Sequence, residues 1–538
     1  PYNIDNTGAT DVYGTLTNAL AAASDGQALF WPTGTFLLGK VLNWGKAGSV
    51  SPSYLQKEVS MIALGNPTNT FIKFTGLNNT DLQSPFFYAG VTSGSTTTIS
   101  SGATPGSQQL VVASAAGFAT NDIIEILQVN DPGISWGYTG SGTDTTQGIL
   151  CRITNIVSNT IYIDTPLNET LNNSPSIKKW GMSTYPIYIK GFAIWNSSTN
   201  TSAGSSSGIH FWKVRRPVVD NCIITNFQTY GVNFEKCYQP LVQNSIIGDA
   251  SNPRSSVYCL YMQDKTTGTK IENNIILSAS SGVLVIGGAK YTSVLYNYFA
   301  RTWPYGYGKD GSWNLVNNLG AAINAHGFGA ADLYAEGNEA SRMGADPTWG
   351  INQRIAAFRN LFTRRDPNYG VNTVSNNNVG FAVQYTNRNA WAAMNIIGLP
   401  EQTGKGWGSI DIGLPDGTTV AYGTPTDTIM VASYTGQRNY LYENNTTAST
   451  GADTYANPPA SLYYSVKPSW WPPDLAYPSF DPGYASKTNW IPAKYRYFGV
   501  PYPIPAEPGS PAQYQGYPIR NLLFPSWWQD VPQIPLVK

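Results

Sequence analysis

The sequence has few charged residues, and neither sign of charge is in excess. Only 12% of the 538 residues are charged, with 32 basic side chains against 32 acidic ones. Proteins that bind nucleic acid need a basic surface for the phosphates, and charged interaction tails need an excess of one sign. The composition therefore argues against both. No apolar run approaches the roughly 20 residues that cross a bilayer, so we expect no membrane span.

Histidine and the common catalytic motifs are also scarce. His210 and His326 are the only histidines. No Ser-His-Asp set, phosphate-binding loop or metal-ligand spacing stands out. What the sequence does have is 13% aromatic residues and abundant Asn, Ser and Thr. This composition suits a secreted or cell-surface protein that contacts sugars, and equally a β-rich extracellular protein without that function.

One short phrase recurs through residues 218–362. Each copy places an Asn between short β-branched segments, and four pairs of copies are 21 to 23 residues apart. A fixed period in the twenties indicates a solenoid, whose stacked coils share one core. Asn suits a corner because it tolerates left-handed backbone, and stacked Asn side chains can form a ladder. The recurring residues are Asn221, Asn244, Asn274, Asn297, Asn317, Asn338 and Asn360.

A second strand precedes the phrase in several coils, as in residues 208–211 and 231–234. Two strands per coil without a leucine consensus argue against a leucine-rich horseshoe. The sequence therefore predicts an all-β fold, a right-handed parallel β-helix. Cys237 and Cys259 lie one coil apart, so we consider either a disulfide or two small buried side chains.

The N-terminal residues predict a cap for this solenoid. Asp11 is expected to N-cap an amphipathic helix that runs through Ala23, followed by strands at 28–31 and 35–38. Gly8-Ala9-Thr10-Asp11 and the segment 29–36 resemble the opening of pectate-lyase-like β-helix proteins, a group that includes polygalacturonase-related enzymes and phage tailspikes. The resemblance implies a β-helix whose open end is plugged by the helix.

Four regions are predicted from these patterns. Residues 1–92 form the cap and first coils, and residues 93–166 form a small antiparallel β-barrel inserted in the helix, which is structural or contacts substrate. Residues 167–445 form the main coils. Residues 446–538 form a closing segment and an extended tail rich in Pro, Tyr and Trp. The tail either folds back along its own solenoid or docks on a neighbouring molecule.

Three longer loops follow the later repeats, and each begins with Arg, contains Asp and carries Trp or Tyr. If all three leave one corner of the stacked coils, they project on one side and form a sugar-binding groove. The alternative is that Arg pairs with Asp locally and covers its own coil. The predicted substrate-binding residues are Arg301, Trp303, Tyr305, Tyr307, Lys309, Arg342, Trp349, Arg364, Tyr369 and His326.

Two mechanisms are considered for this predicted groove. A glycoside hydrolase needs two carboxylates, and acids on neighbouring coils, about 4.8 Å apart, could reach the required separation. A lyase needs a base and a charge-neutralising group for a uronate, often calcium. Because acidic clusters are sparse, we expect no cofactor, with calcium reserved for the lyase case. The predicted catalytic residues are Asp310, Asp346, Asp366 and Glu336; Asp332 and Glu339 are further candidates.

Ala325-His326-Gly327 resembles the Gly-His-Gly of polygalacturonases but begins with Ala, and no Asp-Asp pair lies one coil upstream. His326 is therefore assigned to substrate binding, with a packed turn histidine as the alternative. The balanced charge favours hydrolysis of a neutral or mildly charged polysaccharide over β-elimination. The alternative function is a non-catalytic adhesin or an extracellular filament subunit that self-associates through the C-terminal tail.

Overall fold

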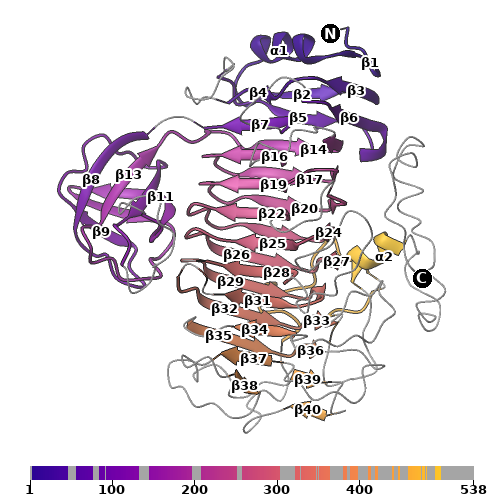
Figure 1. The fold of residues 1–538 in the computed structure, drawn as a ribbon. Coiled ribbons are helices and arrows are strands. Elements are labelled where there is room, and N and C mark those ends of the chain that lie inside the picture. The colour runs from indigo at the N-terminus through magenta and orange to yellow at the C-terminus, as the bar shows by residue number, and fades with distance from the viewer. Residues whose placement is uncertain are drawn as a thin grey trace.

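The computed structural model describes most of the chain. The described residues are 3–45, 56–76, 84–90, 93–131, 145–196, 207–250, 257–302, 321–363 (without 328, 347 and 349), 380–383, 388–397, 410–413, 419–421, 439–441, 446–448, 459–480 (without 474 and 479) and 491–498. Three long sheets and one barrel account for the strands (Figure 1).

The first strand of each coil lies in sheet B. Its ten strands, in spatial order, are β2 (Ala28–Trp31), β5 (Ser60–Ala63), β14 (Ile187–Lys190), β17 (Pro217–Asp220), β20 (Leu241–Gln243), β23 (Lys270–Glu272), β26 (Lys290–Leu295), β29 (Ala331–Glu336), β32 (Gln353–Phe358) and β35 (Arg388–Ala393).

The second strand of each coil lies in sheet A. Its thirteen strands are β1 (Thr7–Asp11), β3 (Gly34–Leu38), β6 (Thr70–Phe74), β15 (Ala193–Asn196), β18 (Ile223–Thr225), β21 (Ile246–Gly248), β24 (Ile275–Ala279), β27 (Tyr298–Thr302), β30 (Glu339–Ala340), β33 (Leu361–Phe362), β36 (Ile396–Ile397), β39 (Asn439–Leu441) and β40 (Thr446–Ala448).

The third strand of each coil lies in sheet C. Its eleven strands are β4 (Leu42–Asn43), β7 (Phe86–Ala89), β16 (Ser207–Trp212), β19 (Tyr230–Glu235), β22 (Tyr258–Gln263), β25 (Ser281–Val285), β28 (Ile323–His326), β31 (Met343–Asp346), β34 (Phe381–Val383), β37 (Ile410–Gly413) and β38 (Thr419–Ala421).

Each coil therefore has three strands, where the sequence predicted two. The reason is the recurring phrase itself, which contains two strands rather than one. In the first clear copy, β17 ends at Asp220 and β18 begins at Ile223, so only two residues form the turn. We call this turn the B–A corner, and the other two turns of each coil the A–C corner and the C–B corner.

The Asn ladder lies at the B–A corner, but its two positions have different roles. The first position of the turn has a left-handed backbone, with φ of 52° at Asn221 and 53° at Asn273. The second position points inward and carries the ladder. There the Asn274 backbone N–H and Nδ2 both donate to Asn297 Oδ1, at 2.9 and 3.0 Å. The same pattern continues through Asn338, Asn360 and Asn395. The sequence spacing suggested that Asn221 and Asn274 are copies of one recurring position. The structure shows that they occupy different positions of the turn.

The core runs along the axis of the coils and holds the inward side chains of all three sheets. Helix α1 (Tyr13–Ala22) lies at the N-terminal end of the stack, where Leu16 and Leu20 join that core (Figure 1). The prediction that Asp11 N-caps the helix is wrong, because the N-cap is Val12. Asp11 Oδ1 instead accepts the N–H groups of Tyr13 and Gly39 and so joins the helix to the chain after β3.

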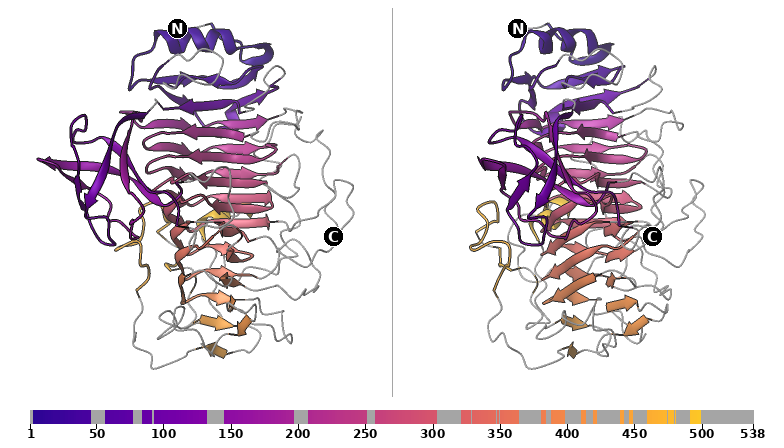
Figure 2. Two further views of the ribbon diagram at one scale, coloured as in Figure 1. Left: turned by 60° about the vertical axis from the view of Figure 1, so that its left-hand side comes forward. Right: turned by 90° about the vertical axis from the view of Figure 1, so that its left-hand side faces the viewer.

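An antiparallel barrel is inserted between β7 and β14 and stands beside the coils (Figures 1 and 2). Its last strand extends the barrel to residue 180, beyond the predicted 166. That strand closes the barrel by pairing with both β8 and β10. The six strands are β8 (Ser93–Ser101), β9 (Gln109–Val112), β10 (Ile123–Leu127), β11 (Gly148–Val157), β12 (Thr160–Ile163) and β13 (Ser176–Trp180).

Buried charge fixes the barrel to the C–B corner. Lys265 Nζ, in a turn of the β-helix, lies 2.5 Å from Glu125 Oε1 of the barrel, and the two side chains are 1% and 3% exposed. Although burial raises the pKa of Glu125, the charges of Lys265 and Lys236 outweigh it and lower that pKa to about 2. Trp180 Nε1 donates to the other oxygen of Glu125 at 2.7 Å. Glu125 is therefore ionised and fully engaged in this contact.

The described part of the C-terminal segment packs on the outside of sheet A. Trp471, Tyr497 and Leu475 form one buried cluster with sheet A residues such as Ile275 and Tyr298. Helix α2 (Pro492–Phe498) belongs to this layer (Figure 1). The predicted aromatic tail, with Phe524, Trp527 and Trp528, lies outside the described residues. Cys151, Cys222, Cys237 and Cys259 are all buried free thiols, so Cys237 and Cys259 are not bridged.

Candidate functional site

The outer face of sheet C carries aromatic and polar side chains in register from coil to coil. Alternate residues of each strand, such as Ile209 and Phe211, are buried in the core, so the residues between them point outward. The pairing aligns Trp212 with Glu235 and Glu235 with Gln263. Farther along the sheet, it aligns His326 with Asp346. These outward positions form one row, which we call the sheet C row: Trp212, Glu235, Gln263, His326 and Asp346.

His326 and Asp346 form the best-defined polar pair of the sheet C row. His326 Nδ1 lies 2.8 Å from Asp346 Oδ1 and 2.7 Å from Oδ2. Burial raises the pKa of Asp346, but the hydrogen bonds and charge of His326 and the hydrogen bonds of Thr348 lower it more, so the net shift is downward. The ionised carboxylate can only accept, which assigns the proton of His326 to Nδ1.

This geometry leaves the other ring nitrogen of His326 available for chemistry. Its Nε2 has no hydrogen-bond partner within the described part of the chain, and the side chain is 27% exposed. Asn324 Nδ2 donates to Asp346 at 3.2 Å, and Asn352 Nδ2 donates to the Asp346 backbone carbonyl at 2.7 Å. A carboxylate that fixes the tautomer and orientation of an imidazole is an arrangement suited to proton transfer at Nε2.

The earlier coils of the same face, at β19 and β22, carry aromatic side chains. Tyr230 stacks on Tyr261 with ring centroids 4.4 Å apart, and Tyr258 stacks on Tyr261 at 5.5 Å. Lys213 Nζ lies 3.8 Å from the centre of the Trp212 ring. Partly exposed rings beside amides and charged groups are the components with which proteins bind sugars, since one face of a pyranose is apolar and its edge is polar.

Glu235 is the carboxylate of these earlier coils. Its Oε2 lies 3.4 Å from His210 Nε2 and accepts from Gln263 Nε2 at 3.4 Å. Burial raises the pKa of Glu235, but the hydrogen bond and charge of His210 and the charge of Lys236 lower it overall. His210 itself packs edge-on against Phe87 and is only 5% exposed. His210 therefore holds Glu235 rather than facing solvent.

The structure separates residues that the sequence placed on one side. Arg301 is the second-last residue of β27 and Arg342 follows β30, so both lie at the A–C end of sheet A. The stretch that begins at Arg342 contains β31, so Asp346 lies at the opposite end of that strand, at the C–B corner. Arg301 and Arg342 thus share one corner, as predicted, and Arg364 lies outside the described residues. The stretch that begins at Arg342 is not one loop, however, because a whole strand separates Arg342 from Asp346.

Glu336 occupies a different part of the molecule from Asp346. Its carboxylate is fully buried and accepts hydrogen bonds from the hydroxyls of Tyr296 and Tyr334 and from the backbone N–H of Leu462. Glu336 therefore fastens the C-terminal segment to the coils. Asp332 is held by Arg354, and Glu339 lies 2.5 Å from Lys494. Each of the described acids that we predicted is thus engaged by a partner of its own, either a basic side chain or tyrosine hydroxyls.

The other predicted residues lie outside the described residues, apart from Arg301, whose backbone alone is described. They are Trp303, Tyr305, Tyr307, Lys309, Asp310, Trp349, Arg364, Asp366 and Tyr369. Sequence reasoning missed Trp212, Glu235 and Gln263. Trp212 and Glu235 are 23 residues apart, which is the period of the repeat. Applying that period to the strand before the Asn phrase could have indicated these two residues.

Within the described residues, no group of three or more His, Cys, Asp and Glu side chains is placed to hold a metal ion. The described part of the chain also has no helix long and apolar enough to span a membrane.

Comparison with known proteins agrees with the coil architecture. A family model described as a right-handed beta helix region matches residues 133–299. The tailspike gp61 of Pseudomonas phage phi297 superposes with a TM-score of 0.52 at 10% identity, over 75% of this chain and 60% of the tailspike. No curated protein matches in sequence. The chain thus folds as a right-handed parallel β-helix.

Two further solved structures resemble the chain less closely. The tailspike gp49 of Pseudomonas phage LKA1 has a TM-score of 0.40 at 13% identity, over 74% of this chain and 77% of that one. Endo-xylogalacturonan hydrolase from Aspergillus tubingensis has a TM-score of 0.41 at 9% identity, over 84% and 99%. At these identities the likeness concerns the fold alone, so function has to be argued from the site.

Proposed function

We propose that this protein is a secreted or cell-surface polysaccharide-cleaving protein, which binds its substrate along the outer face of sheet C. The observation that carries the proposal is the outer face of sheet C, where stacked tyrosine rings lie on the same face as the sheet C row with its Glu235, its Gln263 and its His326–Asp346 pair. Coils that repeat every 4.8 Å or so present such groups at regular intervals, as an extended polymer of sugars requires.

Within this proposal, His326 transfers the proton at the bond that is cleaved. Asp346 orients the ring and stabilises its charged form, while Asn324 and Asn352 hold Asp346 in place. We favour hydrolysis over β-elimination. That Asp310 or Asp366 supplies the second carboxylate stays a prediction, because both lie outside the described residues.

The test is a panel of polysaccharides incubated with the protein, with products separated by mass spectrometry. Hydrolysis adds water to each cleaved bond, whereas β-elimination gives an unsaturated product of lower mass. Asp346→Asn and His326→Gln should each lower turnover by about 100-fold or more, the usual contribution of a positioned acid–base group. Asp220→Asn, a carboxylate of sheet B, is the matched control and should keep full activity.

Two results would overturn parts of the proposal. Equal turnover by the Asp346→Asn variant and the parent would remove the site assignment. Binding of a polysaccharide without any product, with loss of binding in Trp212→Ala, would instead identify a non-catalytic adhesin. Self-association through the tail stays a prediction: deletion of residues 499–538 should leave the oligomeric state unchanged if the tail folds on its own solenoid, and should dissociate assemblies if it joins neighbours.

A further inference from the structure

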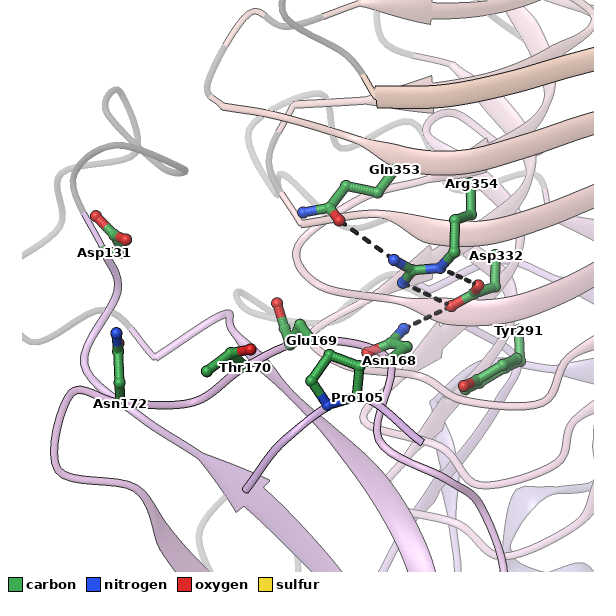
Figure 3. A pocket seen from close by; sticks show the side chains of 10 residues that line it. All are labelled: Pro105, Asp131, Asn168, Glu169, Thr170, Asn172, Tyr291, Asp332, Gln353 and Arg354. Atoms are coloured by element: carbon green, nitrogen blue, oxygen red, sulfur yellow. Dashed lines mark hydrogen bonds and ion pairs between the residues drawn. The ribbon is translucent and has the colours of Figure 1, made fainter. Parts of the chain in front are cut away.

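A polar cavity lies between the barrel and the beginning of the sheet B strands (Figure 3). Its volume is about 650 Å³, within the range of about 300–1,000 Å³ that is usual for ligand sites. The barrel contributes residues 168–172, between β12 and β13, and the helix contributes side chains at the beginning of β26, β29 and β32. The cavity therefore exists only because the barrel is inserted and docked.

The helix wall of the cavity is made by side chains at equivalent positions of three coils. Tyr291, Asp332 and Arg354 each follow the first residue of their strand and have left-handed backbone, with φ between 52° and 56°. Arg216 and Gln239 share this conformation in earlier coils, so the bulge belongs to the architecture of the C–B corner. What differs here is that these three side chains line the cavity (Figure 3), and that Asp332 and Tyr291 also reach the barrel through hydrogen bonds to Asn168 and to the Pro166 carbonyl.

The charged groups of the wall neutralise one another and are held in place. Arg354 donates to both oxygens of Asp332, with Nε at 2.5 Å and Nη2 at 3.1 Å. Asn168 of the barrel donates to Asp332 Oδ2 at 2.5 Å. Behind them, the buried Lys290 pairs with Glu169. The wall is thus rigid before any ligand arrives, and rigid sites lose little conformational entropy on binding.

The chemistry of the lining selects a class of ligand. Pairing of Asp332 with Arg354 and of Glu169 with Lys290 leaves neither cation of this wall without a carboxylate among the described residues. An anion such as a uronate would be disfavoured. Amide, hydroxyl and carboxylate groups around the ring of Tyr291 offer both donors and acceptors, which suits a neutral polyhydroxylated molecule.

We propose that this cavity is a second carbohydrate-binding site, which takes a neutral sugar unit between the barrel and the helix. It goes beyond the proposed function, because it lies on sheet B and the barrel and does not require that sheet C cleave anything. It also gives the barrel a role, since residues 168–172 form the wall opposite Tyr291 (Figure 3).

The experiment titrates the intact protein with glucose, galactose, N-acetylglucosamine and a disaccharide of each, with glucuronate and galacturonate as charged counterparts. Saturation-transfer NMR detects weak binding, and calorimetry measures the tighter cases. At least one neutral sugar should bind, and its uronate counterpart should bind at least tenfold more weakly. Absence of binding by every neutral sugar, or tighter binding of the uronates, would overturn the proposal.

Variants locate the binding. Thr170→Trp places a large side chain at the exposed cavity rim and should abolish binding, while Tyr291→Ala should weaken it at least tenfold. Tyr291→Phe keeps the ring but loses the bond from the hydroxyl to the Pro166 carbonyl, so it should bind nearly as the parent does. Tyr188→Ala removes an exposed tyrosine of sheet B that does not line the cavity, and it is the matched control. Unchanged binding in Thr170→Trp would exclude the cavity.

Further measurements separate this inference from the proposed function. Binding at the cavity should persist in Asp346→Asn, which removes only the proposed cleavage. If sugar binding disappears in Trp212→Ala but survives in Thr170→Trp, the ligand lies on sheet C and the cavity proposal fails alone. Thermal unfolding of each variant shows whether it is folded, and the exposed position of Thr170 makes its substitution the safer of the two cavity variants.

Discussion

The B–A corner and the C–B corner belong to the same coils but are built on different principles. At the B–A corner, the ladder from Asn274 to Asn395 repeats one set of hydrogen bonds and is fully buried. At the C–B corner the backbone conformation recurs but the side chains differ from coil to coil: one turn carries a buried ion pair to the barrel, and later turns carry His326, Asp346 and the wall of the cavity. Repetition of one corner stabilises the stack, which leaves the other free to vary and to carry chemistry.

The largest effect on this comparison should come from Glu125→Gln, at the barrel contact. The amide oxygen that this substitution introduces can still accept the hydrogen bond from Trp180 Nε1, but the ammonium group of Lys265 would remain buried without a counter-charge. Removal of one partner of a buried ion pair typically costs about 3–5 kcal/mol. Denaturant unfolding followed by tryptophan fluorescence measures the loss. Lys190→Ala, in a partly exposed pair with Asp220, is the control and should cost less than about 1 kcal/mol.

The same ion pair makes the two corners respond differently to acid. The pKa of Glu125 is lowered from its ordinary value of 4.5 to about 2 in the folded protein. Its contribution to stability is therefore complete above the unfolded value of 4.5 and is lost as the pH falls toward 2. The ladder has no ionisable side chain. We expect the fluorescence of Trp180 to change in this pH window before circular dichroism reports loss of the coils; simultaneous loss would contradict the comparison.

At the ladder itself, Asn297→Ala should be costly and Asn221→Ala mild. Without Asn297, the Asn274 backbone N–H loses its acceptor, and the Ile271 and Leu295 carbonyls lose a donor. Buried polar groups without partners cost about 1–3 kcal/mol each, so we expect a loss of about 2–4 kcal/mol after relaxation. Asn221 has a left-handed backbone, which Asn tolerates better than Ala does. Its replacement should therefore cost about 1 kcal/mol of stability. Equal losses would show that the two positions are not distinct.

The sequence predicted the coil repeat and the inserted barrel, and it missed the contacts that join distant parts of the chain. The period of the Asn phrase and its β-branched neighbours were sufficient for a parallel β-helix, because each coil obeys the same local rules. The third strand was missed because β17 and β18 are separated by only two residues. The pairing of Asp346 with His326 depends on register between coils 20 residues apart, and the cavity depends on where the barrel docks. Neither contact leaves a local pattern.

The smallest effect expected is a gain at the start of the ladder. Ser245 lies where the following coils have Asn, and its hydroxyl accepts from the Cys222 backbone N–H at 3.1 Å and donates to the Gln243 carbonyl at 2.8 Å. An Asn there can accept from Cys222 through Oδ1 and donate to Asn274 Oδ1 through Nδ2, as the lower rungs do.

Because Ser245→Asn exchanges one satisfied set of hydrogen bonds for another, the change should be stabilising by less than about 1 kcal/mol. Ser245→Ala, which leaves the Cys222 N–H without its acceptor, should lose about 1–3 kcal/mol and is the matched comparison. Thermal unfolding of both variants measures the difference. A large loss in Ser245→Asn would mean that the first rungs are packed too tightly for an amide, and that the ladder begins at Asn274 because the corner itself changes there.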